Sequence, residues 1–317
     1  MVLEARSSGF VLKLQTYRKA GDEMTKRSLF KGNMKRASGT AAAVLLLVGM
    51  LGGTQALAGI TETKHNLGTS VGGTGVNKFS GTEEICVFCH TPHGADTSAA
   101  VPLWNRTMAA PGSYTTYNSL GTSSLDGATA PVGSVSLACL SCHDGTQAMS
   151  TMINAPGSGT AGSAGFQAGT WAGANQSGGK IAAGLITNIG QDLKNDHPVG
   201  IQYAGGPTAA TLPAAGTDYT GFKDADFNTA KSVALNGQTV WYVDTGTAGR
   251  QKTDMQLYTR TEATYAGTSG AGSAIASTVA QPYVECASCH DPHTSAAPTF
   301  LRIANTGSAV CLACHIK

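Results

Sequence analysis

The sequence predicts a mostly irregular fold with short helices, one small β-hairpin and an interior that its own side chains do not fill. Aromatic residues make up 6% of the 317 residues and charged residues 13%, whereas glycine alone occurs 41 times. A chain so rich in small residues buries too little apolar surface to offset its ordering entropy. Two local signals complete the prediction: one cysteine pattern that recurs along the chain, and one short segment with a hairpin turn.

The eight cysteines form four C-x-x-C pairs, and a histidine directly follows each pair. The motifs are Cys86-Val-Phe-Cys89-His90, Cys139-Leu-Ser-Cys142-His143, Cys286-Ala-Ser-Cys289-His290 and Cys311-Leu-Ala-Cys314-His315. C-x-x-C-H is the attachment motif of c-type haem, in which two thiols bond to one edge of the porphyrin and the histidine binds the iron. We therefore expect four covalently bound haems, with the eight cysteines as attachment points and the four motif histidines as proximal ligands.

Three other uses of paired cysteines compete with this interpretation. Exported proteins form disulfides, C-x-x-C can be a redox dithiol, and the last two pairs have a spacing near that of a zinc ribbon. None of these needs a histidine after every pair. Because the chain has only eight histidines, their recurrence after all four pairs favours haem.

Four histidines lie outside the motifs, which is one for each expected haem. They are His65, His93, His197 and His293. This count predicts that all four irons have two histidine ligands and that the spare histidines bind on the distal side. Methionine ligation is the alternative, through Met108, Met149, Met152 or Met255.

Two of the spare histidines share the context C-H-x-P-H, which is completed by His93 in the first motif and His293 in the third. Each lies too close in sequence to reach the far face of its own haem, and the proline stiffens the connection. We expect each to bind the iron of the next haem along the chain, so that His93 serves the second haem and His293 the fourth. His65 and His197 would then serve the first and third.

Covalently held porphyrins would supply the apolar interior that the side chains lack, as metals and disulfides do in other poorly cored chains. The predicted fold class is therefore a haem-cored, mostly irregular multihaem cytochrome c. Its propionates need partners, and arginine suits carboxylates. The candidates for this role are Arg106, Arg250, Arg260 or Arg302, and a surface arginine without such a role is the alternative.

The motifs divide the chain into an N-terminal haem pair in residues 59–150 and a C-terminal pair in residues 282–317, which suggests an internal doubling. The haem-free region 151–281 contains His197 and a Gly/Ala-rich stretch, 155–190, that reads as a linker or a coil against porphyrin faces. It also contains Asn236-Gly237, which suits a type I′ turn between strands 232–235 and 238–243, with a third strand at 256–259.

Residues 1–58 have the pattern of a secretory leader: basic residues, an apolar run at 41–51, and Ala56-Leu57-Ala58 as a cleavage site. The run is short for a membrane span, so a retained anchor is the lesser alternative. Met24 or Met34 would give a more ordinary leader than Met1.

Without the leader, 21 less 9 leaves 12 Lys and Arg, and 19 less 3 leaves 16 Asp and Glu, a formal charge of −4. A nucleic-acid partner is not expected.

Several stretches together resemble the outer-surface multihaem cytochromes of metal-reducing bacteria, including members that assemble into filaments. These stretches are Ile85-Cys-Val-Phe-Cys-His-Thr-Pro-His-Gly94, Pro102-Leu-Trp-Asn-Arg106, Cys139-Leu-Ser-Cys-His-Asp-Gly145, Asn195-Asp-His-Pro-Val-Gly200 and Cys286-Ala-Ser-Cys-His-Asp-Pro-His293. The resemblance implies an extracellular filament of head-to-tail copies, in which a histidine such as His65 binds a neighbour's haem. It also implies upstream periplasmic or outer-membrane cytochromes as electron donors and extracellular acceptors.

Electron transfer without substrate turnover is the predicted function, because two histidines on each iron leave no position for a substrate. A monomeric periplasmic electron shuttle is the alternative, which shares every haem feature. A multihaem reductase would need an open iron, and a purely structural fibre would use its haems only as staples.

Overall fold

The computed structural model describes residues 59–120, 127–157, 162–195, 199–209, 211–246, 248–260 and 280–316. The chain divides into Met1–Gln55 and Ala56–Lys317, and every described residue belongs to the second unit. The expected leader, residues 1–58, and the expected ligand His197 lie outside the described residues. Within the ranges described, no helix has the length and apolar character needed to cross a membrane.

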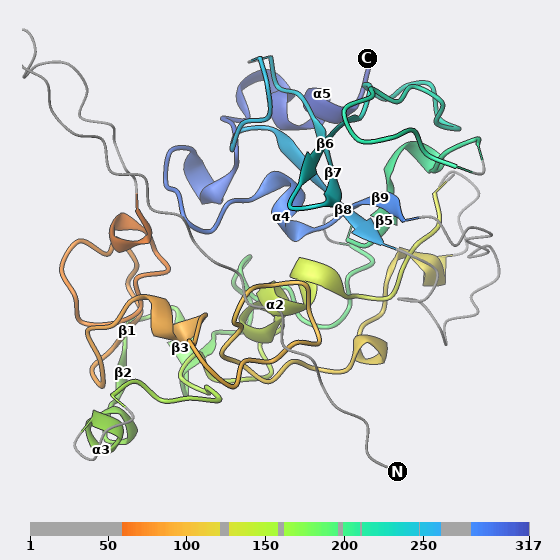
Figure 1. The fold of residues 1–317 in the computed structure, drawn as a ribbon. Coiled ribbons are helices and arrows are strands. Elements are labelled where there is room, and N and C mark those ends of the chain that lie inside the picture. Colours follow the sequence, from red (N-terminus) through yellow and green to blue (C-terminus); the bar gives the residue numbers. More distant parts are fainter. Residues whose placement is uncertain are drawn as a thin grey trace, which may run out of the picture. The chain divides into compact units, whose positions relative to one another are not determined.

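A five-stranded antiparallel sheet is the largest regular element, with strand order β5-β9-β8-β7-β6 (Figure 1). The strands are β5 (Ile201–Gln202), β6 (Lys231–Leu235), β7 (Gln238–Val243), β8 (Met255–Arg260) and β9 (Gln281–Val284). Strands β6, β7 and β8 form a meander, whereas β5 and β9 join its other edge from distant parts of the chain.

The predicted hairpin is confirmed, with Val233 opposite Val240 in the β6–β7 ladder. Asn236 and Gly237 both have positive φ, 49° and 76°, as a type I′ turn requires. The predicted third strand is β8. The sequence did not predict β5 and β9, because β5 has two residues and β9 contains Pro282, which argues against a strand.

One face of this sheet packs against the last two cysteine motifs. Its buried residues include Trp241, Val243, Met255 and Leu257, and the partly buried Cys289 and Cys314 lie against the same cluster, together with other residues. The sheet therefore gives the C-terminal motifs an apolar support made of ordinary side chains.

Short helices occur at all four motifs, as predicted. They are η2 (Cys86–Phe88), α2 (Ser134–His143), α4 (Cys286–Cys289) and α5 (Ala309–Cys314). Helix α2 is the longest of these and buries Leu137 and Leu140. Further 3-10 turns are η1 (Ile60–Glu62), η3 (Pro111–Ser113), η4 (Tyr117–Leu120), η5 (Tyr203–Gly205), η7 (Pro298–Phe300) and η8 (Thr306–Ser308).

The Gly/Ala-rich stretch folds onto the first motif region. Its β2 (Trp171–Ala172) pairs with β1 (Lys78–Phe79), and Trp171 packs in an aromatic cluster with Phe79, Phe88 and Phe166. The stretch also contains α3 (Gly162–Gln167) and the hairpin of β3 (Gln176–Ser177) and β4 (Lys180–Ile181). The aromatic side chains thus make this segment an attached part of the fold, which glycine content alone did not predict.

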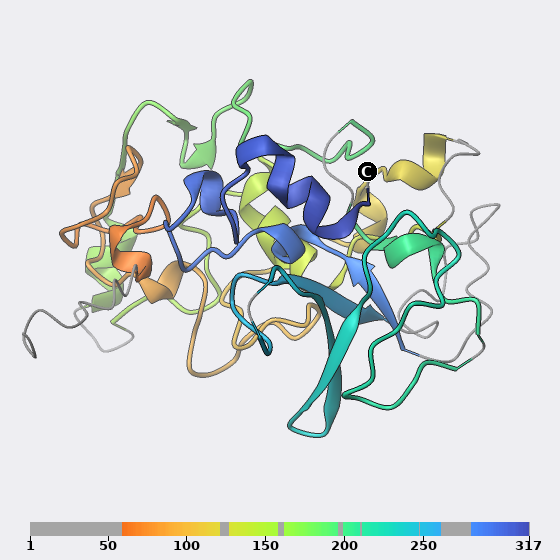
Figure 2. The same cartoon turned by 90° about the horizontal axis from the view of Figure 1, so that it is seen from above.

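A buried ion pair joins the second and third motifs. Arg260 Nη1 lies 2.7 Å from Glu285 Oε1, and the two side chains are 5% and 0% exposed. The Ser136 hydroxyl donates to the other carboxylate oxygen of Glu285 (2.5 Å) and accepts from the Cys286 backbone N–H (2.9 Å). This contact fixes the start of α2 against α4, and the two helices pack together (Figure 2).

Replacing Glu285 by Gln should lower the free energy of unfolding by about 3–5 kcal/mol, because it leaves the buried Arg260 guanidinium without its counter-charge. Lys194→Met is the control. It removes an exposed ion pair with Asp192 (3.3 Å), which should cost no more than about 1 kcal/mol. Urea unfolding of the two variants measures both values, and equal small losses would contradict a stabilising role for the buried pair.

Candidate haem-binding site

The backbone inside every C-x-x-C turn is held by a side-chain donor from elsewhere in the chain. The contacts to carbonyl oxygens are Asn105 Nδ2 to Val87 (2.8 Å), Arg106 Nη2 to Ser141 (2.9 Å), Arg302 Nη2 to Ala287 (2.9 Å), and Asn228 Nδ2 to Leu312 (3.1 Å) and Ala313 (3.0 Å). Each contact fixes the turn that presents two thiols. The sequence interpretation missed Asn105 and Asn228, since their only signal is a polar residue at long range from the motif.

Three of the four motif histidines are oriented by a backbone carbonyl. The Nδ1 atoms of His90, His143 and His290 lie at hydrogen-bond distance from the carbonyl oxygens of Pro102 (2.8 Å), Thr187 (2.8 Å) and Thr299 (2.9 Å). With Nδ1–H donating there, Nε2 is the ring nitrogen left to bind a metal. The ring of His315 lies against Phe227 instead, with centroids 4.2 Å apart.

The first and third motifs share one backbone arrangement. After the first, Thr91 N–H donates to Leu103 O, and Asn105 N–H donates to Cys89 O. After the third, Asp291 N–H donates to Phe300 O and Arg302 N–H donates to Cys289 O in the same way. Both returning loops use a left-handed residue, Leu103 (φ 55°) and Phe300 (φ 62°). Asn105 and Arg302 therefore occupy equivalent positions in two copies of one structural unit.

Two spare histidines face motif histidines at the separation expected across one iron. The ring centroids of His65 and His143 are 6.2 Å apart, and those of His90 and His293 are 6.3 Å apart. Two imidazoles on opposite sides of a metal, each with a nitrogen–metal bond of about 2 Å, place their centroids about 6.3 Å apart. These two separations thus match that of two imidazoles on one iron.

The pairing differs from the expected one. His65, not His93, faces His143 of the second motif, and His293 faces His90 of the first motif, not His315 of the fourth. The reason is tertiary: the loop after the third motif lies against the first two, where Pro292 O is 3.4 Å from His65 Nδ1 and the Phe300 ring stacks on His65 at 4.4 Å. Short spacing in sequence therefore did not identify which motif histidine lies nearest to His293.

Two of the remaining histidines, His93 and His315, have exposed side chains. The carbonyl oxygen of His93 accepts from Asn154 Nδ2 (2.7 Å), so its backbone is fixed while its ring faces solvent. These two rings are consequently accessible from outside the chain.

The environments of the facing rings favour the neutral imidazole that binds metals. Burial, with His143 as a further cause, lowers the pKa of His65 to about 4, and burial also lowers the pKa of His143. Asp291 has the opposite effect on His293: its carboxylate, 3.6 Å from His293 Nδ1, raises the pKa of that ring. A carboxylate at Nδ1 is a common partner of a metal-binding histidine.

The cysteines of successive motifs lie near one another in chain order. Burial, with a contribution from Cys142, raises the pKa of Cys89 to about 12, and the thiols of Cys139 and Cys286 share a hydrogen bond. Burial and the neighbouring Cys289 likewise raise the pKa of Cys314 to about 12. None of the eight cysteines forms a disulfide. The four attachment points thus form a series from the first motif to the fourth.

The arginines expected at the propionates are engaged elsewhere. Arg106 and Arg302 donate to backbone carbonyls, Arg260 pairs with Glu285, and Arg250 donates to the side chain of Gln256. That expectation was wrong for Arg106, whose five N–H donors all have protein acceptors. Sequence alone shows an arginine's charge but not which oxygen takes its hydrogen bonds.

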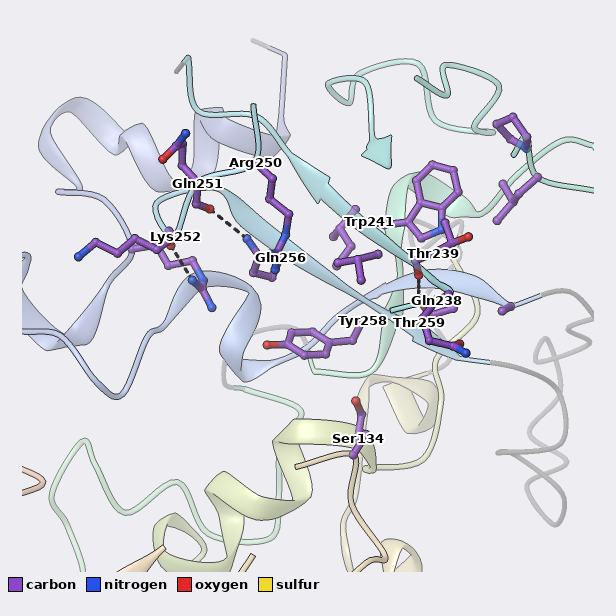
Figure 3. Close-up of a pocket in the computed structure, with 18 residues that line it drawn as sticks. Ser134, Gln238, Thr239, Trp241, Arg250, Gln251, Lys252, Gln256, Tyr258 and Thr259 are labelled. Carbon is purple, nitrogen blue, oxygen red and sulfur yellow. Dashed lines mark hydrogen bonds between the residues drawn. The ribbon is translucent and has the colours of Figure 1, made fainter. Parts of the chain in front are cut away.

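A separate cavity of about 970 Å³ lies beside the sheet. Its lining includes Trp241 of β7, Tyr258 of β8 and Arg250, with Ser134 on the other side (Figure 3). None of the motif cysteines and none of the described histidines lines it. The cavity is therefore distinct from the histidine pairs.

Comparison with known proteins bears on the C-terminal motifs. A family described as a doubled CXXCH motif matches residues 279–317, which include the third and fourth motifs. No curated protein matches the chain. The chain therefore binds covalently attached c-type haem, with which a role in electron transfer is consistent.

Replacing Asn105 by Ala should lower the free energy of unfolding by about 3 kcal/mol, because it leaves the buried Val87 carbonyl and the partly buried Asn154 carbonyl and N–H without their partner. The exposed Asn175 provides the matched control, since Asn175→Ala should change stability by less than about 0.5 kcal/mol. Urea unfolding followed by circular dichroism compares the two. If Asn105→Ala lowers the free energy of unfolding as little as the control does, the Asn105 hydrogen bonds do not stabilise the first motif.

Proposed function

We propose that the chain is an electron-transfer protein with four bis-histidine c-type haems, and that it is a subunit of an extracellular filament. The observation that carries the haem part is the spacing of the two histidine pairs, 6.2 Å for His65 and His143 and 6.3 Å for His90 and His293. Bound haem would supply a redox-active iron at each motif. The chain's own residues fix the thiols and imidazoles, so that few groups would have to move when an electron passes.

His197 is the best counterpart for His290 of the third motif. The chain that follows it is held beside that motif: Gly200 N–H donates to Val284 O (2.8 Å), and β5 pairs with β9. Strand β9 ends two residues before Cys286. After these assignments, His315 of the fourth motif is the motif histidine, and His93 the spare histidine, that are still to be paired.

The last pair supports assembly. Both His93 and His315 are exposed, so a His93 supplied by a second copy of the chain could complete the ligand set of His315. Such a contact joins different faces of two copies, and a non-closing contact of this kind produces a filament. The family resemblance makes His65 a candidate for the shared ligand, but its position between His143 and Phe300 favours a role within one chain.

Two histidines on every iron leave no open position for a substrate, which favours electron transfer over catalysis. We accordingly propose no enzymatic activity. Export to the cell surface, electron donors among periplasmic or outer-membrane cytochromes, and extracellular acceptors complete the proposal. They rest on the leader pattern and the family resemblance.

Replacing His93 by Ala should leave four haems attached but reduce filament number at least tenfold, because the fourth iron of each copy loses a ligand from its neighbour. His65→Ala is the matched control: filaments should persist, while one iron changes from low spin to high spin. Electron microscopy of material sheared from expressing cells and EPR spectroscopy measure these results.

Filaments of His93→Ala that equal those of the wild type would contradict the shared ligand. A wild-type protein with four haems that forms only small monodisperse particles would instead favour the periplasmic shuttle.

A further inference from the structure

Arg106 is a fully buried cation whose hydrogen bonds all go to neutral groups. Its side chain is 0% exposed. Its acceptors are Ser141 Oγ (3.2 Å) and the carbonyl oxygens of Ser141 (2.9 Å), Ala148 (3.0 Å), Met149 (2.8 Å) and Thr151 (2.9 Å). These five bonds use all five N–H donors of the guanidinium. The hydrogen bonds are therefore complete, but the positive charge is not neutralised by them.

Across the described ranges, Arg106 takes part in no ion pair. The buried acid that follows the second motif, Asp144, is engaged by Tyr114 Oη (2.9 Å) and by Thr146. A buried charge without a counter-charge is costly, so it normally has a compensating interaction. The paired Arg260 shows that this chain can supply a buried carboxylate where one is needed.

The guanidinium lies between the first two attachment sites. Ser141, which accepts two of its bonds, stands between Cys139 and Cys142 in the second motif. Asn105, the residue before it, donates its backbone N–H to Cys89 O (2.8 Å) in the first motif.

We propose that Arg106 is a built-in positive charge that raises the reduction potentials of the haems attached at the first and second motifs. This inference rests on the proposed function, since it requires haem at both motifs. When an iron accepts one electron from a donor cytochrome, the positive charge at that site falls by one unit. A fixed cation nearby favours the state with less positive charge, and burial keeps solvent from screening the effect.

The side chains that hold the third and fourth motifs differ from Arg106 in burial or in charge. The third motif is held by Arg302, which is only partly buried and donates to Ala287 and to Lys252 O (2.6 Å). Its charge is consequently exposed to screening by salt. The fourth motif is held by the neutral Asn228.

Three variants at this position separate charge from hydrogen bonding. Arg106→Gln and Arg106→Met are neutral, whereas Arg106→Lys keeps the charge but loses most of the five bonds. Spectroelectrochemical titration measures the four haem reduction potentials. In neutral variants with four attached haems, two of the four potentials should be lower than in the wild type. The expected change is at least tenfold in the reduction equilibrium constant, about 59 mV for one electron. Arg106→Lys, and Lys223→Gln at an exposed lysine, should leave the four haem potentials unchanged.

Three results would overturn the inference: four-haem neutral variants with unchanged potentials, equal shifts in Arg106→Lys and Arg106→Gln, or haem attachment that fails in both neutral variants. The last would assign Arg106 a role in assembly. Mass spectrometry of the wild type comes first, because haem missing from the first two motifs would refute the proposed function and this inference with it. A four-haem wild type with unmoved potentials in the neutral variants refutes only the inference.

Discussion

The hydrogen bonds that hold the backbone inside each C-x-x-C turn are the constraint on which this structure depends. A turn that presents two thiols and a histidine must keep one conformation, yet the motifs have only short helices to stabilise them. Donors from distant segments replace the missing regular structure, as Asn105 does for the first motif and Asn228 for the fourth. Because each donor is anchored in another part of the fold, the positions of the turns are set by the whole chain.

This constraint explains why one loop serves more than one site. The loop after the third motif returns to Cys289 through the Arg302 backbone, which holds Pro292 and Phe300 against His65 and brings His293 to face His90. One segment therefore positions imidazoles at both N-terminal motifs. Such preorganisation suits a ligand set that should not rearrange between redox states.

Local features could be predicted from the sequence, and tertiary ones could not. The β6–β7 hairpin follows from Asn236-Gly237, because two residues with positive φ decide the turn by themselves. The motif helices also follow from local pattern. The partner of His143 is His65, however, and only the fold of segments far apart in sequence decides that. Strand β9 was not predicted because Pro282 argues locally against a strand. The pairing of Pro282 with Thr259 depends on the assembled sheet and cannot be read from the local sequence.

If histidine is the axial ligand on both sides of every iron, ligand type cannot distinguish one site from another, and differences in potential must come from the surroundings. The two buried arginines make those surroundings unequal. Between the second and third motifs, Arg260 and Glu285 form a pair with no net charge at 2.7 Å. Between the first and second, Arg106 has only neutral acceptors. The cysteine motifs follow one another in space in chain order. The uncompensated charge of Arg106 would therefore give the haems at the first two motifs a higher electron affinity than those at the last two. The side chains of the protein would then decide in which direction along the haem series electron transfer is favourable.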